Sequence, residues 1–343
     1  MFNPMFDWKS FPKPIVGLAP MADMTDLPFC LICKEHNAPV IFREMVSSEA
    51  IVRDNAKTWH MTEIDDKERP LVQQIFGKDP TIMADAARLI MERSRPDAID
   101  INMGCPVYNI VSSFNGASLI KDPDRAVAIV RAVKAAVNVP VSVKTRLGWK
   151  EKTECVEFVK RLEDAGADLI TIHGRTKEQA YAGKADWAAV SLARNAVPSL
   201  PFLVNGDITN AATAKQAMAE SGADGVLIGR GALGNPWIFQ ELNAETLPIP
   251  PLLGRAFAPI GHPPDKGERG GFRPSLAERI AVVKHHAALH VQHHGETSLI
   301  KLRKHLPWYF KGMPGMKDLR SALVRVSTLP ELEAILDAAL IKG

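Results

Sequence analysis

The chain of 343 residues has only four cysteines, Cys30, Cys33, Cys105 and Cys155. So few thiols exclude the dense disulfide framework of a small secreted domain and favour a reducing compartment. The sequence also lacks any uninterrupted apolar run of the ~18 residues needed to cross a bilayer. Its first residues lack the basic start and apolar core of a secretory signal. We therefore expect a cytoplasmic protein without a membrane partner.

The sequence has little excess charge of either sign. The 42 lysines and arginines nearly balance the 39 aspartates and glutamates, which leaves a net charge of +3. This balance permits an RNA partner without demanding one. Hydrophobic residues make up 46% of the chain, enough to bury one large core and leave residues over. We expect one large domain and one small domain.

What the sequence does have is a repeated unit. Short apolar runs rich in Val and Ile alternate with longer segments of helical spacing, which is typical of βα units in a parallel sheet. Eight such units predict an α/β fold, a (β/α)8 TIM barrel followed by a small C-terminal helical domain. The predicted strands are 15–19, 40–44, 71–76, 98–102, 139–145, 168–172, 202–205 and 225–228, and the clearest predicted helices are 80–92, 123–137, 153–165 and 211–221.

Composition also suggests the domain boundaries. Residues 1–246 form the predicted barrel. Residues 247–274 are crowded with Pro and Gly and show no periodicity, so we interpret them as a linker or insertion. Helical spacing returns over 275–343, the predicted helical domain. In a closed barrel, chemistry gathers where the strands end, and polar or glycine-containing segments follow almost every predicted strand.

Two of these segments indicate a phosphate site. Gly229-Arg230-Gly231 ends the eighth strand and precedes a helical segment, while Asn205-Gly206-Asp207 ends the seventh. Glycines let backbone N–H groups approach an anion, and barrels often hold phosphate at this corner. Either segment alone fits an ordinary tight turn equally well. Together they favour a phosphorylated cofactor.

Lys144 interrupts an otherwise apolar strand, where a buried ammonium requires a polar or anionic partner. A cofactor would supply that partner, and a salt bridge to Asp100 or Glu44 is the structural alternative. Gln74, on the third strand, offers both a donor and an acceptor to the edge of a flavin ring.

Cys105 lies between Gly104 and Pro106 just after the fourth strand, which predicts a rigid position at the barrel mouth. An ordinary thiol is mostly protonated at neutral pH and suited to delivering a proton. The alternative is a small buried hydrophobic residue. His173 and Arg175 end the sixth strand, where they could hold a flavin phosphate or substrate carbonyls. Capping or ion pairing would also explain Arg175.

Two patterns resemble metal sites. Cys30 and Cys33 form a Cys-x-x-Cys pair inside an amphipathic segment with no second pair, so core packing is the simpler interpretation. Five histidines share helical spacings in the C-terminal region, but no carboxylate accompanies them at ligand spacing in the sequence. We therefore predict no metal. These histidines are His285, His286, His290, His293 and His294.

Bases and aromatics alternate later in the C-terminal region, as in an RNA-binding helix, although a solvated helix face with two core aromatics would also explain the pattern. The residues are Lys301, Arg303, Lys304, His305, Trp308, Tyr309 and Lys311.

Taken in order, these motifs resemble those of the tRNA-dihydrouridine synthases, and the resemblance covers nearly the whole chain. The matching segments are Ala19-Pro20-Met21-Ala22-Asp23-Met24-Thr25-Asp26, Asp100-Ile101-Asn102-Met103-Gly104-Cys105-Pro106, Val143-Lys144-Thr145-Arg146-Leu147-Gly148-Trp149, Ile172-His173-Gly174-Arg175-Thr176, Asn205-Gly206-Asp207-Ile208, Ile228-Gly229-Arg230-Gly231-Ala232 and Lys304-His305 with Trp308-Tyr309-Phe310-Lys311-Gly312.

The resemblance implies an FMN-dependent enzyme that uses NADPH to reduce selected uridines of tRNA to dihydrouridine. Hydride would pass from flavin N5 to uracil C6 while Cys105 protonates C5. The chain would act as a monomer without a protein partner. The implied FMN contacts are Pro20, Met21, Ala22, Gln74, Lys144, His173, Asn205, Gly206, Asp207, Gly229 and Arg230, and the expected substrate or RNA contacts are Asn102, Arg146, Arg175, Arg303, Lys304 and Lys311.

The chain departs from the family pattern at two places. Tyr108 and Asn109 stand where the family commonly has basic residues, and 247–274 is longer than the usual connection. Two other function classes compete with the family's. A flavin barrel acting on a small molecule would leave the helical tail to oligomerisation, and an RNA-binding protein that had lost catalysis would not need Cys105 and Lys144.

Overall fold

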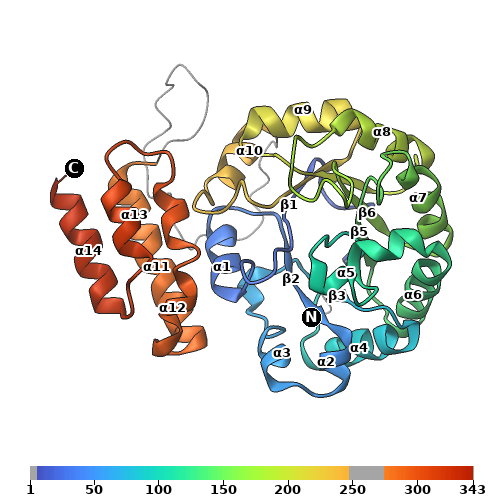
Figure 1. The fold of residues 1–343 in the computed structure, drawn as a ribbon, viewed down its shortest axis with the longest axis horizontal. Coiled ribbons are helices and arrows are strands. Elements are labelled where there is room, and N and C mark those ends of the chain that lie inside the picture. The colour runs from blue at the N-terminus through green and yellow to red at the C-terminus, as the bar shows by residue number, and fades with distance from the viewer. Residues whose placement is uncertain (1–5, 247–273, 343) are drawn as a thin grey trace.

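The computed structural model describes residues 6–246 and 274–342, and the barrel occupies the first of these ranges (Figure 1). Each strand pairs in parallel with the next, and β8 pairs with β1, so the sheet closes into a barrel. The strands are β1 (Ile15–Leu18), β2 (Val40–Ser47), β3 (Leu71–Phe76), β4 (Ala98–Asn102), β5 (Val141–Arg146), β6 (Leu169–His173), β7 (Phe202–Asn205) and β8 (Gly225–Ile228).

The predicted fold class is therefore confirmed, and the strand positions differ mainly at their ends. The fifth strand begins at Val141 instead of at residue 139, because Pro140 has no N–H group to donate to the ladder. The second strand continues to Ser47, with a register shift between Arg43 and Val46 where it pairs with β3. Such an irregularity bends a strand and changes the direction of its side chains.

Helices surround the barrel, and the longer ones begin at side-chain caps. Asp79 and Asp122 accept hydrogen bonds from the first turns of α4 and α6, and a proline follows each of them at a position that suits it. The helices of this part are α1 (Leu27–Glu35), α2 (Ser48–Val52), α3 (Ala56–His60), α4 (Pro80–Arg93), α5 (Tyr108–Val111), α6 (Pro123–Ala136), α7 (Glu154–Asp164), α8 (Trp187–Ala196), α9 (Ala211–Ser221) and α10 (Ile238–Thr246), with short 3-10 turns η1 (Asp66–Glu68) and η2 (Gly116–Lys121).

One end of the barrel is closed by an aromatic side chain. Trp8 is fully buried and stacks on Phe42 of β2, with ring centroids 5.7 Å apart. It packs with inward-facing strand residues such as Ile15, Val72 and Leu203. Because this end is filled by apolar side chains, polar chemistry is confined to the opposite end, where the strands terminate.

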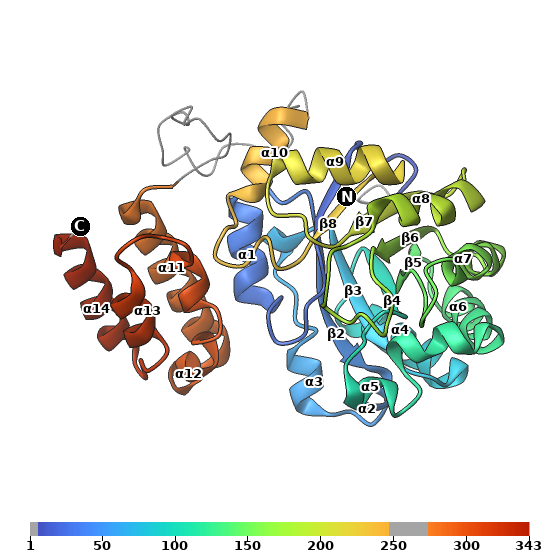
Figure 2. The same ribbon diagram turned by 45° about the horizontal axis from the view of Figure 1, so that its top comes forward.

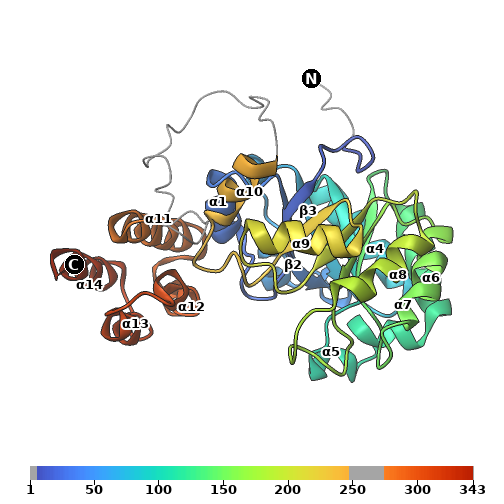
Figure 3. The same ribbon diagram turned by 90° about the horizontal axis from the view of Figure 1, so that it is seen from above.

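The C-terminal helices form a second unit beside α1, away from the strands (Figures 1 and 2). Its elements are α11 (Leu276–His294), η3 (Glu296–Ser298), α12 (Leu299–Leu302), η4 (Leu306–Phe310), α13 (Lys317–Leu323) and α14 (Leu329–Lys342). Helix α11 begins with a capping box between Ser275 and Glu278 and packs against α1, as the view from above also shows (Figure 3).

Each unit contributes a tryptophan to the other. Trp237 precedes α10 in the sequence but joins the core of the helical unit, while Trp308 of η4 packs against the barrel core. The two cores are otherwise separate, which agrees with the predicted change of structure after the barrel. The predicted linker 247–274 lies outside the described residues except for Pro274. No helix among those described is long and apolar enough to cross a membrane.

Candidate active site at the barrel mouth

A chain of buried hydrogen bonds links three strands at the barrel mouth. Gln74 Nε2 donates to Asp100 Oδ2 at 2.6 Å, and Ser142 Oγ donates to the other oxygen of Asp100 at 2.6 Å. Asn102 Nδ2 donates to Gln74 Oε1 at 2.8 Å. Burial raises the pKa of Asp100 to about 6. The network orients the amides of Gln74 and Asn102, and sequence analysis did not assign a role to Asp100 or Ser142 within it.

The same asparagine anchors the turn that carries Cys105. Asn102 Oδ1 accepts hydrogen bonds from the backbone N–H of Gly104 at 3.1 Å and of Cys105 at 2.9 Å. On the other side, the Cys105 carbonyl accepts from Ala117 N at 3.1 Å. Gly116 has a φ of +60°, and a Cβ there would lie 2.9 Å from the Cys105 carbonyl oxygen. Close packing therefore fixes the backbone of Cys105.

The Cys105 thiol is half-buried at the mouth. Burial raises its pKa, although a hydrogen bond from the backbone of Val107 and the nearby Arg146 and Lys144 oppose this effect. The side chain is therefore a neutral thiol over the physiological range. The other cysteines, Cys30, Cys33 and Cys155, are buried, as the packing interpretation of the Cys-x-x-Cys pair predicted for the first two.

Lys144 lies beside Asn102 on the neighbouring strand and opposite Thr171 on the next. Burial and the nearby Arg146 lower the pKa of its ammonium to about 8. Within residues 6–246 and 274–342, neither Asp100 nor Glu44 pairs with it. Glu44 instead accepts a hydrogen bond from Asp23 N at 2.7 Å. The structural alternative for Lys144 is therefore not what the structure contains.

His173, Arg175 and Asp207 form a second cluster across the mouth. Arg175 donates to Asp207 Oδ2 at 2.6 Å and to the Gly183 carbonyl at 2.7 Å, and its Nη1 lies 3.2 Å from His173 Nε2. Burial and the surrounding cations Lys144, Arg146, Arg175 and Arg230 hold the pKa of His173 well below its usual range. His173 is therefore a neutral imidazole that accepts from Arg175.

The glycine segments at the ends of β7 and β8 lie next to this cluster. Gly206 has a φ of +115°, and a Cβ would lie 2.9 Å from that of Ala185. At Gly229 a Cβ would lie 3.4 Å from Met21 Sδ, which brings the first and last strands of the barrel together at the mouth. The exposed Arg230 lies 3.5 Å from Asp207 and completes a basic, glycine-lined corner. Asn205 fixes the corner by donating to the Leu227 carbonyl at 2.8 Å.

The loop after β1 contributes Pro20, Met21 and Ala22. Pro20 and Met21 are half-buried and Ala22 is exposed. Thr25 holds the loop, since its hydroxyl accepts from Met21 N at 2.9 Å. These residues therefore line the mouth between β1 and β8 without being packed away in the core.

Arg146 and Arg175 are each only 2% exposed. Arg146 donates to the carbonyls of Gly104 at 2.6 Å and Ala180 at 2.8 Å. Their contact with RNA stays a prediction, and the structure shows them fastening loops. Sequence analysis missed Tyr181, which is exposed and lies 5.6 Å from the Arg146 guanidinium and 5.4 Å from that of Arg230. An aromatic in the loop after β6 was its one signal.

The C-terminal basic residues differ in their freedom. Lys304 and Lys311 are exposed, and the Lys311 ammonium lies 4.2 Å from the Trp308 ring centroid. Arg303 instead donates to the carbonyls of Val326 at 2.6 Å and Arg325 at 2.7 Å, so it holds the helical unit together. Lys304 and Lys311 therefore offer a free basic surface.

One sequence argument against a metal is corrected by the structure. Several of the C-terminal histidines are accompanied by carboxylates, because α11 packs against the start of α1 and the end of α3. Asp26 lies within ligand distance of His290 and His294, and His60 lies within ligand distance of His293 and His294. A sequence pattern could not show this, because Asp26 and His294 are 268 positions apart.

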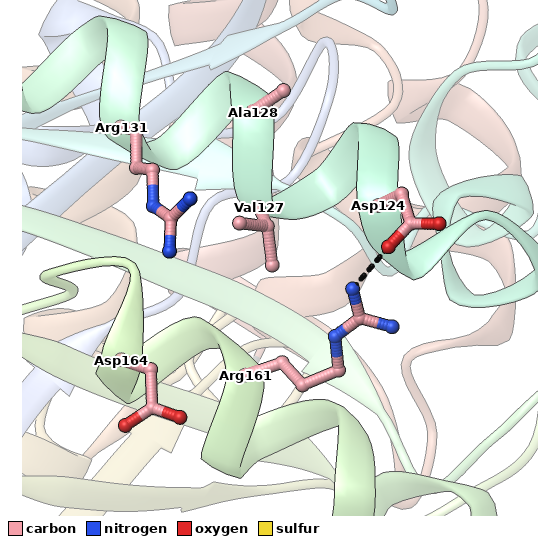
Figure 4. A pocket seen from close by; sticks show the side chains of 6 residues that line it. All are labelled: Asp124, Val127, Ala128, Arg131, Arg161 and Asp164. Carbon is pink, nitrogen blue, oxygen red and sulfur yellow. Dashed lines mark hydrogen bonds and ion pairs between the residues drawn. The ribbon is translucent and has the colours of Figure 1, made fainter.

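A surface hollow lies away from the barrel mouth, on the outer side of the barrel between α6 and α7 (Figure 4). Charged side chains dominate its lining, and Arg161 pairs with Asp124 across it. It contains none of the predicted site residues. Its lining consists of Asp124, Val127, Ala128, Arg131, Arg161 and Asp164.

Solved structures with a similar backbone support the barrel fold. The old yellow enzyme from Trypanosoma cruzi aligns with a TM-score of 0.52 at 10% identity, over 67% of this chain and 88% of that one. A 2-naphthoyl-CoA reductase aligns with a TM-score of 0.52 at 11% identity, over 67% of this chain and 50% of that one. At such low identity, these matches concern the fold alone.

Sequence comparison shows the family. A tRNA-dihydrouridine synthase B of Pseudomonas syringae pv. tomato is 36% identical over 317 residues, 90% of this chain and 86% of that protein. A probable tRNA-dihydrouridine synthase 1 of Synechocystis is 36% identical over 326 residues, 94% of this chain and 85% of that protein. The dihydrouridine synthase model matches residues 17–342. The chain therefore belongs to the dihydrouridine synthase (Dus) family.

Proposed function

We propose that this protein reduces uridines of tRNA to 5,6-dihydrouridine with a bound flavin. The observation that carries the proposal is the pairing, at one barrel mouth, of a neutral thiol on a fixed turn, Cys105, with a half-buried ammonium, Lys144, whose pKa burial lowers. Reduction of the uracil C5–C6 bond requires a hydride and a proton, and a rigid thiol is suited to deliver the proton. The relatives named tRNA-dihydrouridine synthases support the same substrate.

The residues at the mouth fit FMN. Lys144 has no ion-pair partner in the described part of the chain, and an electron-rich flavin edge would balance its charge. Gln74 presents an amide that Asp100 already orients. Gly206, Gly229 and Arg230 form the corner that would hold the phosphate, because glycines expose backbone N–H groups. His173, Asn205 and Asp207 would support that corner, with Pro20, Met21 and Ala22 along the ring.

When bound, FMN reduced by NADPH supplies the hydride that uracil C6 accepts. Cys105 donates its proton to C5, and the raised pKa of the thiol keeps that proton available at neutral pH. Asn102 positions the donor through the backbone N–H groups of Gly104 and Cys105. Tyr181 and the buried Arg146 form the wall next to the entering base.

The helical unit would hold the RNA while one base enters the barrel. A uracil stacked in folded RNA must leave its stack before it can reach the mouth. Lys304 and Lys311 are exposed on the unit that packs beside α1, so they can contact phosphates outside the barrel. We assign residues 1–246 to cofactor and chemistry and 275–343 to tRNA binding by one chain in the cytoplasm.

The test is anaerobic. The purified protein is reduced with NADPH and mixed with unmodified tRNA transcript, and flavin reoxidation and dihydrouridine are measured. Reoxidation with one dihydrouridine formed per flavin oxidised is the expected result. A flavin that stays reduced with tRNA but reoxidises with a small enone would replace the proposal with a small-molecule reductase. Absence of bound flavin would remove the cofactor assignment.

A further inference from the structure

Helix α11 brings two histidines to a carboxylate on the barrel. His290 and His294 are four residues apart, so they lie on the same face of the helix. That face meets Asp26, the N-cap of α1. Asp26 Oδ2 lies 3.2 Å from His294 Nε2 and 3.5 Å from His290 Nδ1. The side chains of Asp26, His290 and His294 are 11%, 2% and 17% exposed, so this contact is largely removed from water.

The hydrogen-bond network fixes which atoms of His290 carry protons. His290 Nε2 lies 3.2 Å from the carbonyl oxygen of Ser298, which can only accept, so Nε2 carries the proton. In the neutral ring Nδ1 then has a lone pair. That nitrogen is buried and has no hydrogen-bond partner. It faces Asp26 Oδ2, another acceptor.

The same reasoning applies to His294 through a longer chain. His60 Nδ1 lies 3.1 Å from the Glu63 carboxylate, so a neutral His60 carries its proton there and its Nε2 accepts. His60 Nε2 lies 3.0 Å from His294 Nδ1, which must therefore donate. The lone pair of His294 is left on Nε2, which also faces Asp26 Oδ2.

Asp26 itself is an anion with one oxygen available. Its Oδ1 accepts from Phe29 N at 3.2 Å as a helix cap. Burial opposes ionisation, but hydrogen bonds from His290 and His294 hold the pKa of Asp26 well below its usual range. The neighbouring His305 cannot balance the charge, because burial lowers its pKa to about 4. Three electron-pair donors thus converge in a buried place, an arrangement that requires a cation.

We propose that Asp26 Oδ2, His290 Nδ1 and His294 Nε2 bind a zinc ion between the barrel and the helical unit. Ligand bonds of ~2.0–2.2 Å in a tetrahedron place ligand atoms about 3.3 Å apart, close to the two distances observed. Imidazole ligands favour Zn²⁺ over Mg²⁺ or Ca²⁺, which prefer oxygen. A water molecule completes the fourth position.

The outer contacts match those of known metal sites. Ligating histidines usually donate their second N–H to a carbonyl or carboxylate, as His290 does to Ser298, while His294 reaches Glu63 through His60. His60 and Glu63 also line a surface cleft, so the ion has a path from solvent. The site lies outside the barrel mouth. Its role is to fasten α11 to α1, and it does not depend on the proposed reaction.

The experiment uses the full chain with its cofactor. The protein is stripped with a chelator, and Zn²⁺ alone is titrated against a chromophoric zinc indicator at pH 7.5. We expect one zinc per chain and an increase of the melting temperature on zinc addition. Asp26→Asn, which keeps the Phe29 cap, and His290→Gln should weaken zinc binding by more than about tenfold. Co²⁺ in the unmodified protein should give the visible bands of four-coordinate geometry, a result that needs no variant to fold.

The matched controls lie on the same helix. His285 pairs with Glu35 at 2.9 Å and is half-exposed, so His285→Gln should bind zinc normally. His293→Gln should as well, although His293 belongs to the neighbouring group with His60 and His294. Loss of zinc in His293→Gln with normal binding in Asp26→Asn would move the ion to that group and overturn the proposal. A chain that takes up no zinc above background would mean that protons, not a metal, neutralise Asp26.

Discussion

Replacing Cys105 by alanine should separate catalysis from folding. Both backbone anchors of the turn survive the substitution, since Asn102 binds the Cys105 N–H and Ala117 binds its carbonyl. The loss of one half-buried sulfur should cost about 1 kcal/mol of stability. Flavin and tRNA binding should persist. A positioned general acid contributes ~10²–10⁴-fold, so the rate of uridine reduction should fall by that factor.

The pH dependence identifies the thiol. Because burial raises the pKa of Cys105, its working form is the neutral thiol. Activity is therefore full at neutral pH and lost as the pH rises through that pKa. The Cys105→Ser variant should retain a low rate without this alkaline decrease, because a hydroxyl does not ionise in this range.

Single-turnover stopped-flow measurements of flavin reoxidation by excess tRNA, from pH 6 to pH 10, would measure both effects. Cys155→Ala is the control, because that thiol is buried on α7 and donates to the Lys152 carbonyl at 3.2 Å. Its rate should equal that of the unmodified protein. A rate in Cys105→Ala within about threefold of normal would refute the proton-donor assignment, and so would an unchanged alkaline limb in that variant.

Three further predictions concern the cofactor and the RNA. In Lys144→Met, FMN binding to the flavin-free protein should be weak and independent of pH, whereas in the unmodified protein it should weaken as the pH rises through about 8, where the ammonium loses its proton; equilibrium dialysis would detect equal affinities. Gly231→Ala should lower the melting temperature strongly, because a Cβ would lie 2.1 Å from the Ile208 carbonyl oxygen, while Gly229→Ala should fold and lose FMN affinity. Lys304→Ala with Lys311→Ala should weaken tRNA binding without changing the flavin spectrum and should reduce the salt slope by about 1 per phosphate contact; an unchanged slope in filter binding would remove the RNA surface.

The sequence alone determined the barrel and its mouth. Strand positions follow from runs of Val and Ile with a βα period, and the alternation of strand and helix leaves few topologies open. Cys105, Lys144 and Gly229 could be placed at one end because the carboxyl ends of parallel strands share an edge. These are local patterns combined with one rule of topology, so they need no knowledge of side-chain contacts.

Only the tertiary structure decided which polar groups have partners. Lys144 could have paired with Asp100, but Asp100 binds Gln74 and Ser142 instead. Arg175 carried the same charge as the exposed Arg230 in the sequence, yet it is buried against Asp207. The histidines of α11 had no carboxylate until packing brought Asp26 to them. Hydrogen bonds and ion pairs depend on distances of a few ångströms between segments hundreds of positions apart, and no local pattern encodes those distances.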